Sequence, residues 1–313
     1  MNICFYADDP KWSQLSNGGG TRTILLSAKT LQQLGHKVSI VAHKDRFTWF
    51  EHIKPVKSVP KHAEVVVAVH VCDVPHVLKY ARKHKVAYWA RPFETWAMPE
   101  LKIVSLLKRF HKAGGTIMAN SRWPVEFLQK HGVPAHVQYA GIAPYEFVGR
   151  EGPRNSDSKP VVGCQFSKAP RKGWKKFKKL HKILGDKAEY VAFGSSQCDV
   201  DWCRFAKCPS HEALQMLYSC CDYFFCPNKL EGFYNVGAEA GLSGCRLVRF
   251  DYRRNGMADY STRQNSLVVG SVREAAERIV ERAEPAHQEW LKWSILAIGT
   301  REENMQKMVE VLG

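Results

Sequence analysis

The sequence predicts an α/β protein of two Rossmann-like domains with a cleft between them. Its 313 residues are enough for two domains of roughly 100–200 residues each. Short apolar segments alternate with amphipathic ones along most of the chain, which is typical of parallel sheets covered by helices. One polar stretch rich in turn residues, 151–160, interrupts the alternation near the middle. We therefore expect one domain over residues 1–152 and a second over 153–313, and the terminal helix can pack back on the first domain.

The first half begins with a strand, a glycine loop, a helix and a second strand. We expect these at Ile3–Ala7, Asn17–Thr21, Thr23–Leu34 and Val38–Ala42. A glycine loop in this place brings backbone amides against phosphates, although its spacing is not the dinucleotide fingerprint. Further strands are expected at Val65–Val69, Val86–Trp89, Thr116–Ala119 and Val137–Tyr139, and further helices at Val74–His84, Leu101–Ala113 and 122–130, the last preceded by Ser121.

The second half repeats the alternation after the polar stretch. Strands are expected at Val161–Cys164, Glu189–Phe193, Tyr223–Cys226, Cys245–Phe250 and Leu267–Val269. Helices are expected at Trp174–Leu184, His211–Ser219, Val272–Ala283 and Glu302–Leu312, with one more that begins near Asn235 as its N-cap.

The chain offers little sign of a membrane or secreted protein. No apolar run approaches the roughly 18–20 residues that span a bilayer, and the first nine residues become acidic too soon for a signal peptide. Cys4, Cys164 and Cys245 lie in apolar strand contexts, where cysteine behaves as a small buried hydrophobe. We therefore expect a cytoplasmic protein, in the host cytoplasm if the source is viral.

One cluster of possible metal ligands contains Cys198, Cys203, Cys208 and His211. The residue types suit zinc, but the spacings do not match the close Cys-x-x-Cys pairs of structural sites. We assign no metal and no cofactor.

The charge of the chain is concentrated in one segment. The net charge is +16, and residues 159–187 carry ten basic residues against one acid, Asp186. The rest of the second half is slightly acidic. Such a patch indicates a polyanionic partner.

The segment from Glu231 to Glu239 is the most informative stretch. Two carboxylates flank the loop Gly232–Val236, whose backbone N–H groups and following helix dipole would face a ligand. Acceptors beside free donors suit a ligand with hydroxyls and a phosphate, such as a nucleotide sugar. A surface loop followed by an amphipathic helix is the alternative that this pattern leaves open.

The second half resembles the retaining glycosyltransferases of family four, which have the GT-B fold. The matching segments are Ser210–Asp222, the Glu-x7-Glu motif Glu231–Glu239, Gly256–Tyr260, Asn265–Val269 and, in the first half, Ala119–Trp123 and Tyr139–Ile142. The resemblance covers most of the chain. It implies a nucleotide-sugar donor, such as a UDP-sugar, and transfer with retention of configuration, without a metal or a required protein nucleophile.

The resemblance also implies roles on the donor side. Glu231 would bind donor-sugar hydroxyls, and Glu239 would accept hydrogen bonds from the nucleotide ribose. The sugar and phosphate would be held by the amides of Gly232, Phe233, Tyr234, Asn235 and Val236. Lys172-Gly173 matches the family's Lys-Gly, which neutralises the diphosphate. The family's preceding Gly-Arg is changed to Gly163-Cys164, so that Lys168 or Arg171 is the candidate for the missing cation. Gly18, Gly19 and Gly20 match the glycine loop that approaches the donor phosphate, with an ordinary tight turn as the alternative.

On the acceptor side this chain departs from the family pattern. Ala90-Arg91 stands where many members carry a site histidine. Arg91 and Glu94 are our candidates for substrate contacts, together with His70. An ion pair at the cleft edge and a satisfied strand-end histidine are the structural alternatives.

The acceptor is expected to be DNA. The basic segment includes Lys175, Lys176, Lys178, Lys179 and Lys182, which we assign to nucleic-acid binding. The apolar face of their helix, including Ile183, is expected in the core, which leaves nothing to insert into a membrane. DNA glucosyltransferases of bacterial viruses share this fold and modify hydroxymethylated bases, so we favour a hydroxymethylated base as acceptor. A membrane glycolipid or surface glycan is the alternative, then a non-catalytic DNA-binding module, and then a nucleotide-sugar epimerase. The sequence leaves the oligomeric state open.

Overall fold

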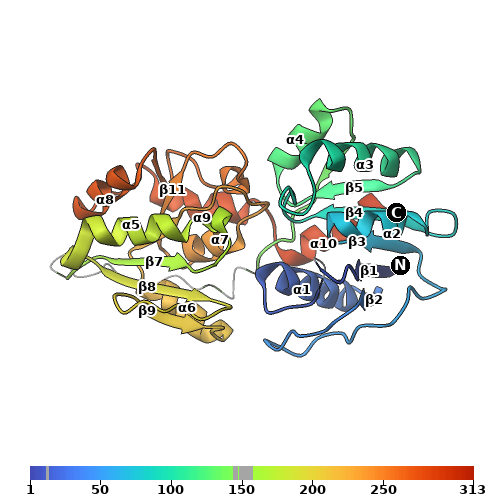
Figure 1. Cartoon of the computed structure of the whole chain (residues 1–313), viewed down its shortest axis with the longest axis horizontal. Helices are drawn as coiled ribbons and strands as arrows, with labels where there is room; N and C mark the ends of the chain where they lie inside the picture. Colours follow the sequence, from blue (N-terminus) through green and yellow to red (C-terminus); the bar gives the residue numbers. More distant parts are fainter. Residues whose placement is uncertain (12–13, 144–146, 148–157) are drawn as a thin grey trace. The chain divides into compact units, whose positions relative to one another are not determined.

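The structure is a computed structural model that describes residues 1–11, 14–143, 147 and 158–313. The chain forms two compact units, one of Met1–Gly141 with Thr300–Gly313 and one of Ile142–Gly299. The boundary expected between residues 152 and 153 lies outside the described residues. Each unit is built on its own parallel sheet (Figure 1).

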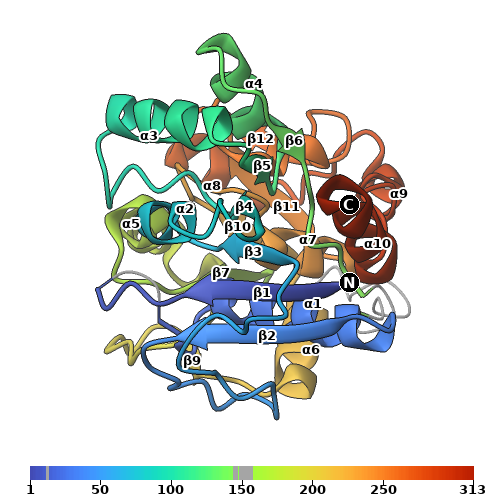
Figure 2. The same cartoon turned by 90° about the vertical axis from the view of Figure 1, so that its right-hand side faces the viewer.

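The first unit contains a six-stranded parallel sheet, whose strands lie side by side in Figure 2. In spatial order the strands are β2 (Lys37–Ala42), β1 (Asn2–Ala7), β3 (Val65–Ala68), β4 (Lys85–Ala90), β5 (Thr116–Ala119) and β6 (His136–Val137). The order changes direction between β1 and β3. In open α/β sheets such a switch point marks the place where loops diverge and ligands bind.

Helices cover both faces of this first sheet. On one face lie α2 (Val74–Leu78), α3 (Glu100–Lys112) and α4 (Arg122–Lys130), and on the other α1 (Gly19–Gln33) and α10 (Arg301–Leu312). Alternation along β1 divides its side chains: Cys4 packs with the first group and Phe5 with the second. A capping box between Thr300 and Glu303 begins α10, whose Met305 joins the core beside α1.

The second unit repeats the plan with six parallel strands. In spatial order they are β12 (Leu267–Val269), β11 (Arg246–Phe250), β10 (Tyr223–Cys226), β7 (Val161–Gln165), β8 (Glu189–Gly194) and β9 (Arg204–Lys207). The switch point lies between β7 and β10, so the loops after these two strands diverge there.

Helices of the second unit also divide between two faces. The helices α5 (Trp174–Leu184) and α8 (Val272–Val280) pack together on one core. The other group comprises α6 (His211–Cys220), α7 (Asn235–Leu242) and α9 (Gln288–Leu296), in which α7 contacts both others. On α5, Trp174, Phe177, Leu180 and Leu184 are buried as expected, whereas Ile183 is 42% exposed, which corrects its assignment to the core.

The α/β class and the two parallel sheets predicted from the sequence are confirmed. Two elements were missed: the edge strand β9 and helix α9. Helix α1 starts at Gly19 and therefore absorbs the end of the predicted glycine loop, α2 ends at Leu78 rather than at residue 84, and Asn235 is the first residue of α7 instead of its N-cap. Cys4, Cys164 and Cys245 are buried as predicted.

Within the described residues, no helix is long and apolar enough to cross a membrane. All ten cysteines are free thiols.

Candidate functional site

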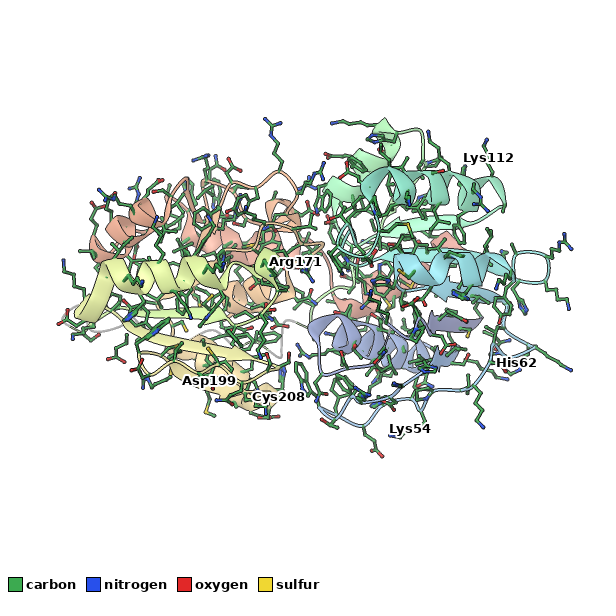
Figure 3. All side chains as sticks on the ribbon, viewed as in Figure 1. Lys54, His62, Lys112, Arg171, Asp199 and Cys208 are labelled. Atoms are coloured by element: carbon green, nitrogen blue, oxygen red, sulfur yellow. The ribbon has the colours of Figure 1, made fainter. Side chains whose placement is uncertain are left out.

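The donor-side candidates of the second unit gather at its switch point. The loop after β7 carries Arg171 and Lys172, and the loop after β10 carries Glu231. The two loops are joined directly, because the backbone N–H of Lys229 donates to the carbonyl oxygen of Arg171 at 2.9 Å. Figure 3 shows Arg171 beside the start of α5. Residues that lie far apart in the sequence therefore meet where the fold favours ligand binding.

Glu231 is a buried carboxylate surrounded by donors. Its side chain lies 2.5 Å from Lys172 Nζ and 3.8 Å from Arg171, both measured to Oε1. Asn228 Nδ2 donates to the same oxygen at 2.8 Å. A buried carboxylate is costly unless it is paired and hydrogen-bonded, and here both conditions hold. The arrangement fixes a negative and a positive group side by side at one edge of the sheet.

The backbone around Glu231 is fixed by the loop after β11. Glu231 N donates to Arg254 O at 3.3 Å, and Gly256 N donates to Glu231 O at 3.3 Å. Asn255 Nδ2 also donates to Asn228 O at 2.8 Å. Neither asparagine was singled out from the sequence, because only the folded loops bring them together.

Gly173 positions Lys172 and admits no other residue easily. Its φ of +75° lies in the left-handed region, and a Cβ would come within 2.5 Å of Pro227 O. The Lys-Gly pair noted in the sequence therefore has a local cause: the turn after Lys172 passes directly over the backbone that follows β10.

Cys164 occupies the place where the resemblance leads us to expect arginine. Its side chain is 1% exposed and packs in the core with Trp174. Burial raises the pKa of the Cys164 thiol well above its ordinary value. The cations near the sheet edge are instead Arg171 and Lys172, which lie beside Glu231. Lys168 lies exposed in the same loop.

The aromatic residues of the segment Gly232–Val236 support the loop. Phe233 is 7% exposed and Tyr234 2% exposed. Tyr260 donates its hydroxyl to Tyr234 O at 2.9 Å, and Lys172 Nζ lies 5.5 Å from the centre of the Tyr234 ring. These side chains hold the backbone at the start of α7, where Asn235 and Val236 are partly exposed.

Glu239 lies about one turn into α7 and is buried. Its Oε2 accepts from the Tyr218 hydroxyl at 3.0 Å. Tyr218 is itself fully buried on α6. The second carboxylate of the motif is therefore fixed by a tyrosine that the sequence analysis did not single out.

The acceptor-side candidates gather at the switch point of the first unit. Asp73, fully buried after β3, accepts at Oδ1 from the backbone N–H groups of Asp8 and Asp9, which follow β1. His70 Nδ1 accepts from Cys72 N at 3.2 Å. Burial, together with the nearby Arg91 charge, lowers the pKa of His70 to about 4, so the imidazole is neutral near pH 7.

Arg91 links three segments of the first unit. Its Nε and one terminal nitrogen donate to Val69 O at 3.2 and 2.6 Å. A Cβ on Gly20 would lie 2.7 Å from the Arg91 guanidinium, so the first turn of α1 rests against this side chain. Gly18 and Gly19 precede it as N-cap and first helical residue.

Glu94 is a buried acid of this cluster with a raised pKa. It is fully buried, and Tyr88 donates its hydroxyl to Oε2 at 2.5 Å. Its other oxygen, Oε1, is buried and has no hydrogen-bond partner among the residues that the structure describes. Burial is the main cause that raises the pKa of Glu94 to about 7, against the opposing effects of Tyr88 and Arg91.

The nucleic-acid candidates lie along α5. Lys175, Lys178, Lys179 and Lys182 are exposed. Lys176 is only partly exposed, because its Nζ lies 4.0 Å from the centre of the Phe250 ring. The two units thus hold the predicted residues in three groups: Glu231, Glu239 and the loop cations at one sheet edge, the lysines on α5, and His70, Arg91, Glu94 and Gly18–Gly20 in the other unit.

A depression of about 640 Å³ in the first unit lies elsewhere. It is lined among others by Met1, Val65, Lys85 and Gly114, at the amino ends of the strands. This is the opposite edge of the sheet from the candidate residues. Since ligands of open α/β sheets bind at the carboxyl ends, we place no site in it.

No known protein-family model and no curated protein matches the chain. Solved structures do. A sucrose-phosphate synthase from Thermosynechococcus elongatus matches with a TM-score of 0.78 and 13% identity, covering 99% of this chain and 98% of that one. Anabaena HepE in complex with UDP-glucose also gives 0.78 at 13% identity, covering 100% and 99%.

The chain has the GT-B fold. A third structure of this fold, an alpha-glucosyltransferase in complex with UDP and a 13-mer DNA containing an HMU base, matches with a TM-score of 0.64 and 11% identity, covering 100% of this chain and 99% of that one. At these identities the likeness establishes the GT-B architecture of the chain, and its activity has to be argued from its own residues.

Proposed function

We propose that the protein is a nucleotide-sugar-dependent glycosyltransferase. The observation that carries the proposal is the buried Glu231 held against Lys172 and Arg171 at the switch point of the second unit. A nucleotide sugar presents hydroxyls and a diphosphate, and this edge offers a fixed carboxylate beside fixed cations. The UDP and UDP-glucose complexes of proteins with the same fold support the choice of ligand class.

We assign the following roles. Glu231 binds donor-sugar hydroxyls and supports positive charge at the reacting carbon, while Lys172 and Arg171 neutralise the departing diphosphate. Glu239 accepts from the ribose. The first amides of α7 and of Gly232–Val236 bind sugar and phosphate. Buried neighbours fix both carboxylates before a donor arrives, and this limits the reorganisation required during reaction.

The proposed reaction retains the configuration at the sugar. The bond from the anomeric carbon to the phosphate oxygen breaks, and a bond from that carbon to the acceptor oxygen forms on the same face. The acceptor proton passes to the leaving phosphate oxygen. No protein nucleophile is required, so the cations of the loop after β7 supply the main stabilisation.

The finer proposal concerns the acceptor, which we take to be a hydroxymethylated base in DNA. The net charge of +16 and the exposed lysines of α5 favour a polyanion. A protein of the same fold has been solved with DNA that contains an HMU base. Arg91, Glu94 and the neutral His70 form the acceptor-side group, in which the unpartnered Glu94 Oε1 suits a hydroxyl or amino hydrogen.

Donor binding is tested by calorimetry with UDP-glucose and other nucleotide sugars. Glu231→Gln and Lys172→Met should each weaken donor binding or hydrolysis, while Lys292→Met, which removes an exposed cation on α9, should not. If no nucleotide sugar binds or is hydrolysed, the transferase proposal fails. That result would favour a DNA-binding module on an inactive scaffold, for which the buried Cys164 in place of arginine is the supporting observation.

The acceptor is tested with radiolabelled donor, hydroxymethylated duplex DNA and bacterial lipid extract in parallel. We expect label in the DNA, and reversal of the α5 lysine charges should weaken DNA binding but spare donor hydrolysis. Label in the lipid fraction alone would contradict the DNA proposal and favour a glycolipid enzyme.

A further inference from the structure

Three loops at the carboxyl edge of the second sheet carry a large excess of positive charge. They follow β7 (residues 166–173), β10 (227–234) and β11 (251–255). Together they hold six cations and two carboxylates: Lys168, Arg171, Lys172, Lys229, Arg253, Arg254, Glu231 and Asp251. Asp199 and Asp201 lie outside these three loops, in the connection that runs from the carboxyl end of β8 to the amino end of β9.

The basic side has a defined backbone. Lys229 N donates to Arg171 O, and Glu231 N donates to Arg254 O, so the three loops are hydrogen-bonded to one another. They follow three neighbouring strands, β7, β10 and β11, and so span about 10 Å. The backbone of the three loops is therefore fixed along one edge of the sheet.

The two carboxylates of these loops are engaged by other groups. Glu231 is buried against Lys172, and Asp251 pairs with Arg263 at 3.1 Å. Lys229 and Arg253 are both exposed, and neither side chain forms an ion pair or hydrogen bond among the residues that the structure describes. Arg171 and Lys172 both lie beside Glu231 and belong to the donor-side group. Lys229 and Arg253 are two further cations at the same edge.

The lysines of α5 are placed differently. The helix starts at the carboxyl edge after β7 and runs back toward the amino end of β8. Lys182 therefore lies about 10 Å farther along the helix than Lys175. Lys178, Lys179 and Lys182 therefore lie farther from the edge where a sugar would be transferred, whereas Lys229 and Arg253 lie on it.

We propose that Lys229 and Arg253 bind the phosphodiester backbone of a nucleic-acid acceptor beside the donor site. The inference rests on the proposed function and names where the acceptor strand is held. Exposed cations without counter-ions suit phosphates. A lipid surface fits less well, because membrane-surface segments need large exposed apolar side chains, and the described residues of these three loops include none.

The test measures binding of the full-length protein to a fluorescent duplex over a range of salt concentrations. The double variant Lys229→Ala, Arg253→Ala should reduce the slope of log K against log salt by about 2 relative to wild type. The matched control Arg278→Ala, Lys292→Ala removes two exposed cations elsewhere on the unit and should leave the slope unchanged. A second comparison, Lys178→Ala, Lys179→Ala, removes two cations of α5.

The outcomes show whether the loop cations or the lysines of α5 bind the duplex. An unchanged slope in the first variant, or a loss only in the α5 variant, overturns the inference even if wild type transfers sugar to DNA. The inference is also overturned if the first variant binds phosphatidylserine vesicles more weakly than wild type but binds the duplex equally well. Donor binding, measured in parallel with UDP-glucose, should be equal in the first variant and wild type. Loss of donor binding in the first variant would place these cations in the donor site instead. Failure of wild type to bind any donor would contradict the proposed function, and the salt slope would still decide whether Lys229 and Arg253 bind nucleic acid.

Discussion

Glu94→Gln should change how the stability of the first unit depends on pH. Burial raises the pKa of Glu94 from an ordinary 4.5 to about 7. Its folded state therefore holds the proton over a range in which the unfolded chain has released it. For a carboxyl with a raised pKa, the free energy of unfolding falls as pH rises from the unfolded to the folded value. Glu94 should thus destabilise the first unit at neutral and alkaline pH.

The magnitude follows from the size of the shift. A rise of about 2.5 in the pKa corresponds to a total loss of about 3 kcal/mol in the free energy of unfolding. About 2.5 kcal/mol of this loss occurs between about pH 5 and about pH 8. His70 acts in the opposite direction. Because its pKa is lowered to about 4, the free energy of unfolding falls as pH falls from about 6.5 to about 4. Only the difference between the variant and wild type isolates Glu94.

The assay is hydrogen exchange of the β4 amides, corrected for intrinsic rates, which reports the unfolding free energy of this unit alone. The stability of Glu94→Gln relative to wild type should rise by about 2.5 kcal/mol from about pH 5 to about pH 8. The exposed Glu281→Gln serves as the control. A pH-independent difference between Glu94→Gln and wild type would refute the burial argument. Tyr88→Phe should raise the pKa of Glu94 further, because it removes the hydroxyl donor that favours the ionised form, and should therefore enlarge the loss of stability with rising pH.

Three further predictions concern the second unit. Lys172→Met should lower turnover of a bound donor by roughly 10²-fold, because one fixed cation of the leaving-group site is lost, and steady-state kinetics measure this; unchanged turnover would exclude Lys172 from that role. Glu239→Ala should weaken nucleotide-sugar binding in calorimetry, and equal affinity would contradict the ribose assignment. Gly173→Ala should cost about 2 kcal/mol or more in urea unfolding, since a left-handed φ and a clash with Pro227 O combine, while Gly132→Ala, with a φ of +70° but open space around it, should cost about 1 kcal/mol.

Much of the fold could be predicted because buried parallel strands are apolar throughout. Val65–Ala68 and Tyr223–Cys226 are recognisable without any partner, and the helices between such strands carry a clear apolar face. The edge strand β9 was missed because it is only half buried, and its sequence Arg-Phe-Ala-Lys lacks that signal. Helix α9 was missed because Trp290 and Trp293 are exposed beside buried Leu291, which blurs the helical period.

The candidate site could be predicted where residues follow one another in the sequence. Glu231, Glu239 and Lys172 belong to short motifs. Their partners Asn228, Asn255 and Tyr218 come from separate loops and helices, and no local pattern marks them. The raised pKa of Glu94 depends on complete burial beside Tyr88, a property of the folded sheet that composition does not reveal.

The packing of α10 determines when the first unit can finish folding. Met305, Met308 and Leu312 fill the core between α1 and the sheet, yet residues 142–299 of the second unit come before them in the chain. The second unit is thus an insertion within the first. During synthesis, the apolar face of α1 and β1 stays uncovered until the second unit has been made, and in that interval it is exposed to aggregation or to a chaperone. Removal of residues 300–313 should therefore release the first unit from its folded state while the second unit keeps its own core.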